Sequence, residues 1–538
     1  MFQSLNGHFE LIVLMTNVEH ISVLKPSYWD YSKLVESNRP TYQKRKEEKI
    51  AHFVSSFISK NLYQKTQFNT PMNLNAEVLK GLYGKNYKKD VIDPLTKCGY
   101  LRVNDKYSAG NFSKSYNLKL TGYTPTTEVK LVDSHFVLKV RTIAKRRTQY
   151  ILKHYPESQA VYHTLLHTTI DYNACLQHLN SKFNTKFFKT LYLHLLGRFG
   201  KVNTKELLRL CYKGNSTKGQ YRKAIKNQIK RKFELDQTDL DNILKYTKSF
   251  ATYKSYIWHL KNWKQLSEAD IHQKPDFIFF TSDKSKRLYH NATSTPKEIR
   301  RFLKVDGNPL VEIDASNSQW FLLVALLKKH KEEKVQHILY NHTREQITRG
   351  TGGETTHQEQ QPKPLHLMLN PFSKELHKLE AYLEQGYFRK AMTEAFSKEV
   401  GRPVEEGEVK GLLIKRILFE DPTRGYLNNE PIVKVFKSIF PTLYKAITEL
   451  KKDGLDYQSY GYLPKDSYKA LAVELQKMES SIFIRSVHKR LEGVLRLSIH
   501  DALLVQEKDA KQVLNALQVT AKDKWQINLK ATLSRLEK

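Results

Sequence analysis

Two aspartates each lie beside a short apolar segment, and this arrangement suits metal-dependent chemistry. Asp314 follows Leu310–Ile313, which has strand character, and polar residues then lead into an apolar helix. Asp501 lies within Leu495–Val505, where alternating apolar residues flank the pair His500–Asp501. Carboxylates at the ends of two neighbouring strands can hold two divalent ions about 4 Å apart, as phosphoryl transfer requires. Taken singly, an aspartate of this kind is more often a turn residue or a helix cap.

The elements that must position these aspartates are a strand–turn–helix unit and a β-hairpin. We expect Asp314 at the end of the strand and Asp501 at the tip of the hairpin. The chain between the two aspartates is mostly helical by pattern. An exception is 341–365, where Gly, Thr, Gln and Pro dominate, so we expect a flexible insertion there.

The composition indicates a nucleic-acid partner. Lys and Arg number 89 against 55 acidic residues in 538, which gives a net charge of +34. A chain so basic repels itself unless it meets a polyanion, and nucleic acid is the usual one; an acidic membrane surface is the alternative. No segment approaches the roughly 20 apolar residues of a membrane-spanning helix. The apolar segment Phe9–Met15 lacks a basic flank, so no signal peptide is expected.

Cysteine usage favours a reducing compartment. The three cysteines share no metal-ligand spacing and cannot form a disulfide framework; they are Cys98, Cys175 and Cys211. We therefore expect a cytoplasmic protein.

The first 125 residues contain the element order of a winged helix. A helix is expected over Gln43–Lys60, followed by two short helices and two strands around a loop. These elements are Asn75–Tyr83, Tyr87–Cys98, Tyr100–Val103 and Ser115–Lys119. A small α+β domain of another kind fits the same pattern.

Residues 126–275 are expected to form a helical region that binds nucleic acid. They contain a basic run interleaved with Tyr212 and Tyr221. Its members are Lys213, Lys218, Arg222, Lys223, Lys226, Lys230, Arg231 and Lys232. A helix of this kind can follow a phosphate backbone, with Lys223, Lys226 and Lys230 as candidate contacts. An ordinary solvated face is the alternative.

The two aspartate segments resemble motifs A and C of the family A DNA polymerases and of their relatives, the single-subunit phage-type RNA polymerases. Motif A in these enzymes is a strand, an aspartate, a small polar turn and a helix. Motif C is a short strand that ends in His-Asp, as in Ser498-Ile-His-Asp501. The resemblance implies that Asp314, Asp501 and the backbone carbonyl of Ala315 hold the metal ions.

The segment Glu408–Phe419 resembles motif B of the same enzymes. Lys415 and Phe419 lie one helical turn apart, as the lysine that meets the triphosphate and the aromatic residue that meets the base would. Lys410 is a second candidate for that lysine, and Arg416 is a further nucleotide contact. The glycine-rich ending of the motif is replaced by Glu420-Asp421-Pro422. A basic amphipathic helix without a ligand is the alternative. Val435–Tyr444 is similar to the aromatic segment that follows in the family.

Three further segments resemble family elements in the same order. Lys286–Tyr289 resembles the Gly-Arg-Leu/Val-Tyr element, and the pair Arg300–Arg301 occupies the basic position before motif A. Gln476–Ile482 resembles the glutamine-bearing helix that touches the primer–template. The primer and template contacts implied are His500, Gln476, Glu479, Arg287, Arg300 and Arg301. The resemblance covers about residues 280–520, and no carboxylate set of a proofreading exonuclease is found in residues 1–270.

The resemblance implies an α+β right-hand polymerase, with an antiparallel palm sheet and helical fingers and thumb. We expect an N-terminal basic region with a winged helix (1–125), a thumb-like region (126–275), and palm and fingers (276–538, with fingers about 366–450). The implied cofactors are two Mg²⁺ ions, with Mn²⁺ as the alternative. The implied partners are a DNA primer–template and dNTPs or NTPs, with accessory replication proteins compatible and no membrane.

The expected activity is DNA-directed DNA synthesis by a divergent member of the family, from a bacterial host, phage, plasmid or other mobile element. The position five residues after Asp314 is glutamate in family A DNA polymerases and glycine in the phage-type RNA polymerases. Here it is Gln319, whose bulk favours dNTPs. RNA or primer synthesis is the alternative within the superfamily, and a non-catalytic replication-initiation protein is the alternative outside it. A His-Asp phosphohydrolase fits less well, because its pair lies in a helix.

Overall fold

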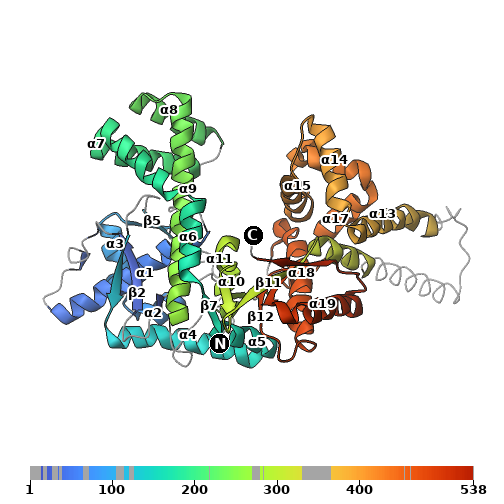
Figure 1. Ribbon diagram of the computed structural model, residues 1–538, viewed down its shortest axis with the longest axis horizontal. Coiled ribbons are helices and arrows are strands. Elements are labelled where there is room, and N and C mark those ends of the chain that lie inside the picture. Colours follow the sequence, from blue (N-terminus) through green and yellow to red (C-terminus); the bar gives the residue numbers. More distant parts are fainter. Residues whose placement is uncertain are drawn as a thin grey trace, which may run out of the picture.

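The computed structural model has an α+β fold built on antiparallel sheets (Figure 1). It describes residues 14–15, 21–26, 29, 34–35, 39–64, 72–104, 114–119, 126–216, 219–268, 279–282, 284–329, 365–452, 455–460 and 462–536. Buried apolar side chains in these ranges form three clusters: one in the N-terminal part, one in the projecting helices and a large one around the central sheet. The predicted α+β class is confirmed.

The N-terminal part combines two small antiparallel sheets with a long helix, at the left of Figure 1. The sheets have the strand orders β1-β2-β6 and β3-β5-β4. The strands are β1 (Leu14–Met15), β2 (Ile21–Pro26), β3 (Met72–Asn73), β4 (Leu101–Asn104), β5 (Ser115–Leu118) and β6 (Thr126–Leu131). The helices are α1 (Pro40–Gln64), α2 (Ala76–Tyr83) and α3 (Asp93–Lys97), which continues a π-helical turn at Lys88–Ile92. These elements match the predicted ones closely, α1 being longer at both ends, while residues 105–113 of the predicted loop lie outside the described ranges.

Side-chain caps explain where several of these helices begin and end. The Asn75 side chain accepts a hydrogen bond from the Glu77 N–H (2.7 Å), and Gly84 ends α2 with a φ of +93°. Asp133 caps the next helix by accepting from the Phe136 N–H (2.8 Å). The Glu48 carboxylate accepts from the N–H groups of Val132 and Asp133 and so ties α1 to the segment after β6.

Long helices connect the N-terminal part to the central sheet and project beyond it. They are α4 (Ser134–His154), α5 (Gln159–Leu166), α6 (Tyr172–Lys182), α7 (Thr185–Ser216), α8 (Gly219–Phe233) and α9 (Gln237–Glu268). Helix α7 is kinked at Gly200, where φ is +70°. Helices thus make up most of the described residues of 126–275, and β7 (Thr168–Ile170) leaves this region to join the central sheet. None of the helices in the described ranges is long and apolar enough to cross a membrane.

The central sheet has the strand order β12-β13-β11-β10-β7, and β14 also pairs with β11. Its remaining strands are β10 (Leu303–Val305), β11 (Asn308–Ala315), β12 (Arg496–Ile499), β13 (Ala502–Gln506) and β14 (Ala531–Arg535). Strand β11 is the centre: it pairs antiparallel with β10, β13 and β14. Its apolar residues from Leu310 to Ile313 are buried because this strand has neighbours on both edges. A separate two-stranded hairpin precedes β10 in the chain. Its strands are β8 (Phe279–Thr281) and β9 (Leu288–His290).

Helices surround the sheet, and those from α13 to α17 form a lobe at the upper right of Figure 1. The surrounding helices are α10 (Asn291–Ser294), α11 (Lys297–Arg300), 318–329, α13 (Leu365–Gln385), α14 (Phe388–Val400), α15 (Glu406–Leu412), α16 (Pro431–Ile439), α17 (Pro441–Lys452), α18 (Lys469–Ser480) and α19 (Ala510–Trp525). Trp320 joins this lobe to the core, with its ring 4.9 Å from Phe388 and 5.6 Å from Phe436. The predicted helical segment between the two aspartates is present, and 341–364 of the predicted insertion lie outside the described residues.

A buried arginine holds the start of strand β12. Arg496 is 2% exposed and donates hydrogen bonds to the carbonyls of Leu491 (2.8 Å) and Val494 (3.0 Å). It also donates to His488 Nδ1 at 2.9 Å, so this imidazole carries its proton on Nε2. Burial lowers the pKa of Arg496 to about 10, which leaves it charged near neutral pH.

The substitution Arg496→Met should lower the free energy of unfolding by about 2 kcal/mol or more, because two buried carbonyls lose their donor. Urea denaturation followed by circular dichroism measures the loss. The control is Arg485→Met, whose exposed side chain bonds one carbonyl and which should change stability by less than about 0.5 kcal/mol. Equal effects of the two substitutions would contradict a structural role for Arg496.

Candidate active site

The two predicted aspartates lie side by side at one end of the central sheet. Asp314 is next to last in β11 and pairs with Ala502, the first residue of β13. The Ala315 N–H donates to the Asp501 carbonyl at 3.0 Å, which places the Ala315 backbone beside Asp501 as well. The structure therefore brings together the three groups predicted to hold metal ions.

Asp501 is presented by a tight turn. Strands β12 and β13 pair from Ile499 and Ala502 onward, so His500 and Asp501 are the two turn residues. His500 adopts a φ of +54°, a region that is costly for residues other than glycine. A strained turn at this position fixes the direction in which the Asp501 carboxylate points.

The electrostatics of the pair favour a bound cation. Burial raises the pKa of Asp314, and the charges of Asp501 and Glu312 raise it further. The charges of Lys410 and Lys297 act in the opposite direction. A divalent cation between Asp314 and Asp501 would relieve the repulsion between them.

The buried carboxylate of Glu479 lies next to this pair, on the side of Asp501. Glu479, on α18, is 1% exposed and forms an ion pair with Arg287. Burial raises the pKa of Glu479 to about 7, although Arg287 opposes this shift. The Ser318 hydroxyl lies 3.2 Å from Glu479 Oε1 and 3.4 Å from Asp501 Oδ2, so it links the two acids. Glu479 was predicted as a primer or template contact, and Ser318 was not predicted at all; its place in the first turn after the strand of Asp314 was the available signal.

Of the predicted arginine pair, Arg300 faces the acids. Glu312, 6% exposed on β11, is ion-paired with Lys297 (2.9 Å) and lies 3.5 Å from Arg300 Nη1. Burial lowers the pKa of Arg300, whereas Glu312 raises it. Within the described part of the chain, its Nε and Nη1 have no hydrogen-bond partner. Arg301 instead lies over the Phe302 ring, at 5.5 Å.

His500 is held as a neutral imidazole. Burial lowers its pKa to about 4, and the charge of Arg287 lowers it further. Its ring contacts Tyr289 edge to face, with 5.6 Å between centroids. Its Nδ1 is buried and makes no hydrogen bond to any described residue. His500 is thus suited to a supporting or primer-contacting role rather than to acid–base chemistry.

The two candidate lysines of the helical lobe differ in their relation to Asp314. Lys410 lies in α15 and Lys415 in the π-helical segment Leu413–Phe419, and both side chains are exposed. The charge of Lys410 is among those that lower the pKa of Asp314.

The neighbouring candidates face other groups. Arg416 forms ion pairs with Glu420 (3.0 Å) and Glu430 (3.2 Å), and Phe419 is partly buried against the main core. The end of the π-helical segment is held by Lys451, whose ammonium donates to the carbonyls of Ile417 (2.5 Å) and Glu420 (2.9 Å). These contacts fix the segment that carries Lys415.

The turn after Asp314 carries two further polar groups. Gln319 has a buried Oε1 without a hydrogen-bond partner in the described ranges. Asn317 adopts a φ of +58° and accepts a 2.6 Å hydrogen bond from Arg389 Nε on α14. The Arg389 contact joins the helical lobe to the aspartate turn and was not predicted from sequence.

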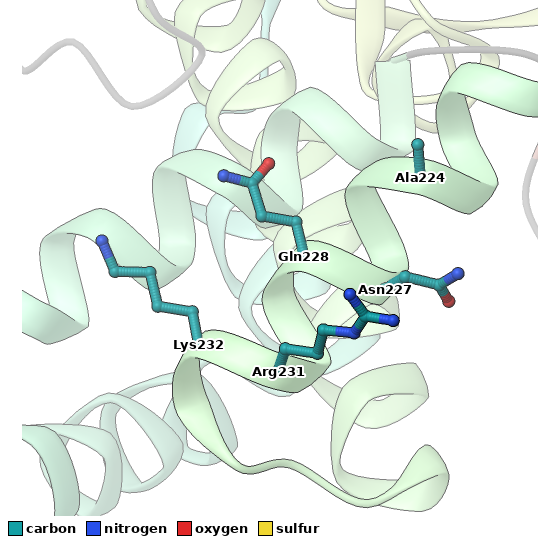
Figure 2. A pocket seen from close by; sticks show the side chains of 5 residues that line it. All are labelled: Ala224, Asn227, Gln228, Arg231 and Lys232. Atoms are coloured by element: carbon teal, nitrogen blue, oxygen red, sulfur yellow. The ribbon is translucent and has the colours of Figure 1, made fainter.

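The remaining predicted contacts lie on two helices. Gln476 is half-buried on α18, one turn before Glu479. Lys223, Lys226 and Lys230 lie on α8, which projects away from β11 and β12 in Figure 1. A pocket on α8 is lined by Ala224, Asn227, Gln228, Arg231 and Lys232, all from the same helix (Figure 2). Because one helix face provides its whole lining, this hollow does not enclose a ligand. The side chains of Tyr212 and Lys213, and all of Lys218, lie outside the described part.

The donor set fits divalent ions that keep water and substrate ligands. In the described ranges, no three side chains of His, Cys, Asp or Glu gather to hold a metal ion. Mg²⁺ is commonly held by one or two carboxylates together with substrate phosphates and water. Asp314, Asp501 and the Ala315 carbonyl match that pattern.

Of the comparisons with known proteins, the one with solved structures gives matches. No protein-family model and no curated protein matches the chain. Among solved structures, it is similar to the POL domain of Pol1 from M. smegmatis, solved with a DNA primer-template and dNTP. That match has 13% sequence identity and a TM-score of 0.38, and it covers 74% of this chain and 72% of the other.

The substitution Arg287→Met should destabilise the site, because it leaves the Glu479 charge buried without its cation. Removing one partner of such a pair costs up to about 3–5 kcal/mol, and the loss should grow as the pH rises and Glu479 ionises. The double variant Arg287→Met/Glu479→Gln should recover most of this loss, because the buried charge is gone. Thermal unfolding of the three proteins measures both effects. If the double variant were as unstable as the single one, the ion pair would not be the source of the loss.

Proposed function

We propose that this chain is a template-directed nucleotidyltransferase that adds dNTPs to a primer 3′-OH. The observation that carries the proposal is the register of β11 and β13, which holds Asp314 and Asp501 side by side at the end of a central antiparallel sheet. The net charge of +34 supports a nucleic-acid partner. The resemblance of the sequence motifs to family A DNA polymerases points to DNA as the product.

The residues of the site have distinct proposed roles in metal binding and orientation. Asp314, Asp501 and the Ala315 carbonyl would hold two Mg²⁺ or Mn²⁺ ions. Such ions, when bound, activate the attacking 3′-oxygen and stabilise the leaving pyrophosphate. Ser318 orients the Asp501 carboxylate through its hydroxyl.

The cations around the site are proposed to attract the phosphates of the nucleotide and of the bound strand. Lys410 neutralises the triphosphate next to Asp314, with Lys415 further along the same helical segment. Arg300, which is ion-paired with Glu312, adds positive charge beside the two aspartates, and this charge favours the phosphates of a bound strand. Electrostatic stabilisation of this kind supplies most of the catalysis in phosphoryl transfer.

Gln319 is proposed to select the sugar. It lies five residues after Asp314, in the first turn of the helix that follows the aspartate turn. Its bulk disfavours a ribose 2′-OH, as the corresponding glutamate does in the family that the motifs resemble.

The N-terminal part is proposed to be a winged helix that docks on duplex DNA. The element order α1-β3-α2-α3-β4-β5, with the sheet order β3-β5-β4, supports this. Exposed basic side chains follow α2 and continue through the π-helical turn, α3 and β4: they are Lys85, Lys88, Lys89, Lys97 and Arg102. Such side chains suit contacts to phosphates.

The substitutions Asp314→Asn and Asp501→Asn should each abolish extension of a labelled primer–template in Mg²⁺, because each removes a carboxylate from the metal ligands. Binding of the primer–template, measured by gel shift, should persist. The matched control is Asp509→Asn, since Asp509 lies just beyond β13 and outside the site; it should extend normally.

The same assay separates the alternatives when dNTPs and NTPs are offered separately. Extension with dNTPs alone would support DNA synthesis and the role of Gln319. Extension with NTPs, or synthesis without a primer, would point to an RNA polymerase or primase. Absence of synthesis with DNA still bound would favour a non-catalytic replication-initiation protein.

The substitution Lys410→Ala should lower kcat/KM for the incoming nucleotide by about tenfold to a hundredfold, the loss expected for a charged hydrogen bond. Lys415→Ala should have a smaller effect, because Lys410 is the lysine whose charge reaches Asp314. Steady-state kinetics with varied dNTP concentration measures both. The reverse order of effects would assign the triphosphate to Lys415.

A further inference from the structure

Four tyrosines lie close together in sequence in the loop before α18, at residues 455–460 and 462–468, which we call the tyrosine loop. They are Tyr457, Tyr460, Tyr462 and Tyr468. The loop is held by its own backbone: the N–H groups of Tyr460 and Tyr462 both donate to the Tyr457 carbonyl, at 3.2 and 3.1 Å. All four side chains are half-buried, so their rings are fixed in place and still reach solvent.

Lysines surround these rings. Lys284 Nζ lies 3.8 Å from the centre of the Tyr462 ring, and Lys469 Nζ lies 5.9 Å from it. Lys477 Nζ lies 4.7 Å from the Tyr460 ring and donates to the Tyr460 hydroxyl at 3.0 Å. The tyrosine loop therefore presents aromatic rings and cations together.

The lysines are incompletely neutralised. Lys469 is paired with Asp466 (2.6 Å) and Lys477 with Glu474 (3.4 Å). Lys284 has no carboxylate at ion-pairing distance in the described ranges, and both burial and the charge of Lys469 lower its pKa. Lys465 is a further exposed cation in the same loop. Asp456 is a further acid of the loop, so four lysines stand against three acids in the described part of the site, and this excess favours an anionic partner.

Lys284, which contacts the Tyr462 ring, belongs to a turn that hydrogen bonds join to the candidate active site. Lys284 belongs to the turn between β8 and β9, and two residues later the Lys286 carbonyl accepts from Ser480 Oγ at 2.5 Å. The next residue, Arg287, pairs with Glu479, which Ser318 links to Asp501. On the other side, Tyr468 lies close enough to Arg424 for the two to interact electrostatically. The tyrosine loop thus lies between the catalytic end of the sheet and the helical lobe.

We infer that the tyrosine loop and Lys284 bind an unpaired segment of a nucleic-acid strand near the catalytic aspartates. Single-stranded nucleic acid is recognised by aromatic rings that stack on bases and by cations that contact the adjacent phosphates. A duplex hides the faces of its bases, so it cannot use the rings. The inference rests on the proposed function in one respect: it identifies the bound strand as the unpaired template next to the primer end.

The test compares two labelled DNAs, a primer–template with a 5′ template overhang and a blunt duplex, by fluorescence anisotropy with the full-length protein. Tyr462→Ala should weaken binding of the overhang DNA by about fivefold to a hundredfold, the effect of losing one stacked base. Binding of the blunt duplex should change less than about twofold. Tyr462→Phe should bind both DNAs as the unmodified protein does, because it keeps the ring and loses only the hydroxyl.

Lys284→Ala tests the phosphate contact. It should reduce the salt dependence of overhang binding by about one unit of slope. The matched control is Lys437→Ala, because Lys437 Nζ also lies over a tyrosine ring, 4.7 Å from that of Tyr444 on α17. In this variant, the difference in affinity between overhang DNA and blunt duplex should equal that of the unmodified protein. Circular dichroism of every variant checks that the fold is kept.

Two outcomes would overturn the inference: Tyr462→Ala binding the overhang DNA normally, or losing both DNAs equally. These readouts measure binding, so they do not depend on synthesis. Absence of primer extension by the unmodified protein, with the overhang effect of Tyr462→Ala intact, would refute the proposed function and support the tyrosine loop as a single-strand site. Normal primer extension by the unmodified protein, together with normal overhang binding by Tyr462→Ala, would refute the single-strand role of the tyrosine loop. It would leave the proposed function unaffected.

Discussion

Two carboxylates held close together at the end of a rigid sheet impose the constraint on which the rest of the site depends. The register of β11 with β13 places Asp314 opposite Ala502 and next to Asp501. A shift of one residue would turn the Asp314 side chain to the other face of the sheet. Pairing with β13 and with β14 resists such a shift, because the shift would break both ladders at once. The fold thus supplies the precision that metal-dependent chemistry requires.

The repulsion between these acids explains the charges around them. Glu312 and Glu479 add negative charge near the pair, and each is compensated by its own cations: Lys297 and Arg300 for Glu312, Arg287 for Glu479. Buried ion pairs of this kind add little net stability, because desolvation offsets the attraction between the charges. Their value here lies in orientation, since they hold donors and carboxylates in fixed places before a substrate arrives.

The helical lobe contributes to the site from outside the sheet. Packing of Trp320 against Phe388 and Phe436 fixes the lobe against the helix that follows Asp314, and Arg389 bonds the aspartate turn directly. Lys410, whose charge lowers the pKa of Asp314, lies next to Val409, which is buried in the large apolar cluster. The link between core packing and the charge near the aspartates is physical: a lysine on a loosely packed helix would be too variable in position to act on one carboxylate.

The sequence by itself determined the parts of this protein that depend on local pattern. The apolar run before Asp314, the alternation around His500–Asp501 and the helical periodicity between them predicted the strand, the hairpin and the helical insert, because residues two or four positions apart share a face. The tertiary structure alone decided which distant residues meet. The link from Glu479 through Ser318 to Asp501, the influence of Lys410 on Asp314, the contact of Lys284 with Tyr462 and the addition of β7 to the central sheet all join elements far apart in the chain. Periodicity carries no information about such contacts, because they are set by how whole elements pack and not by the spacing of residues within one element.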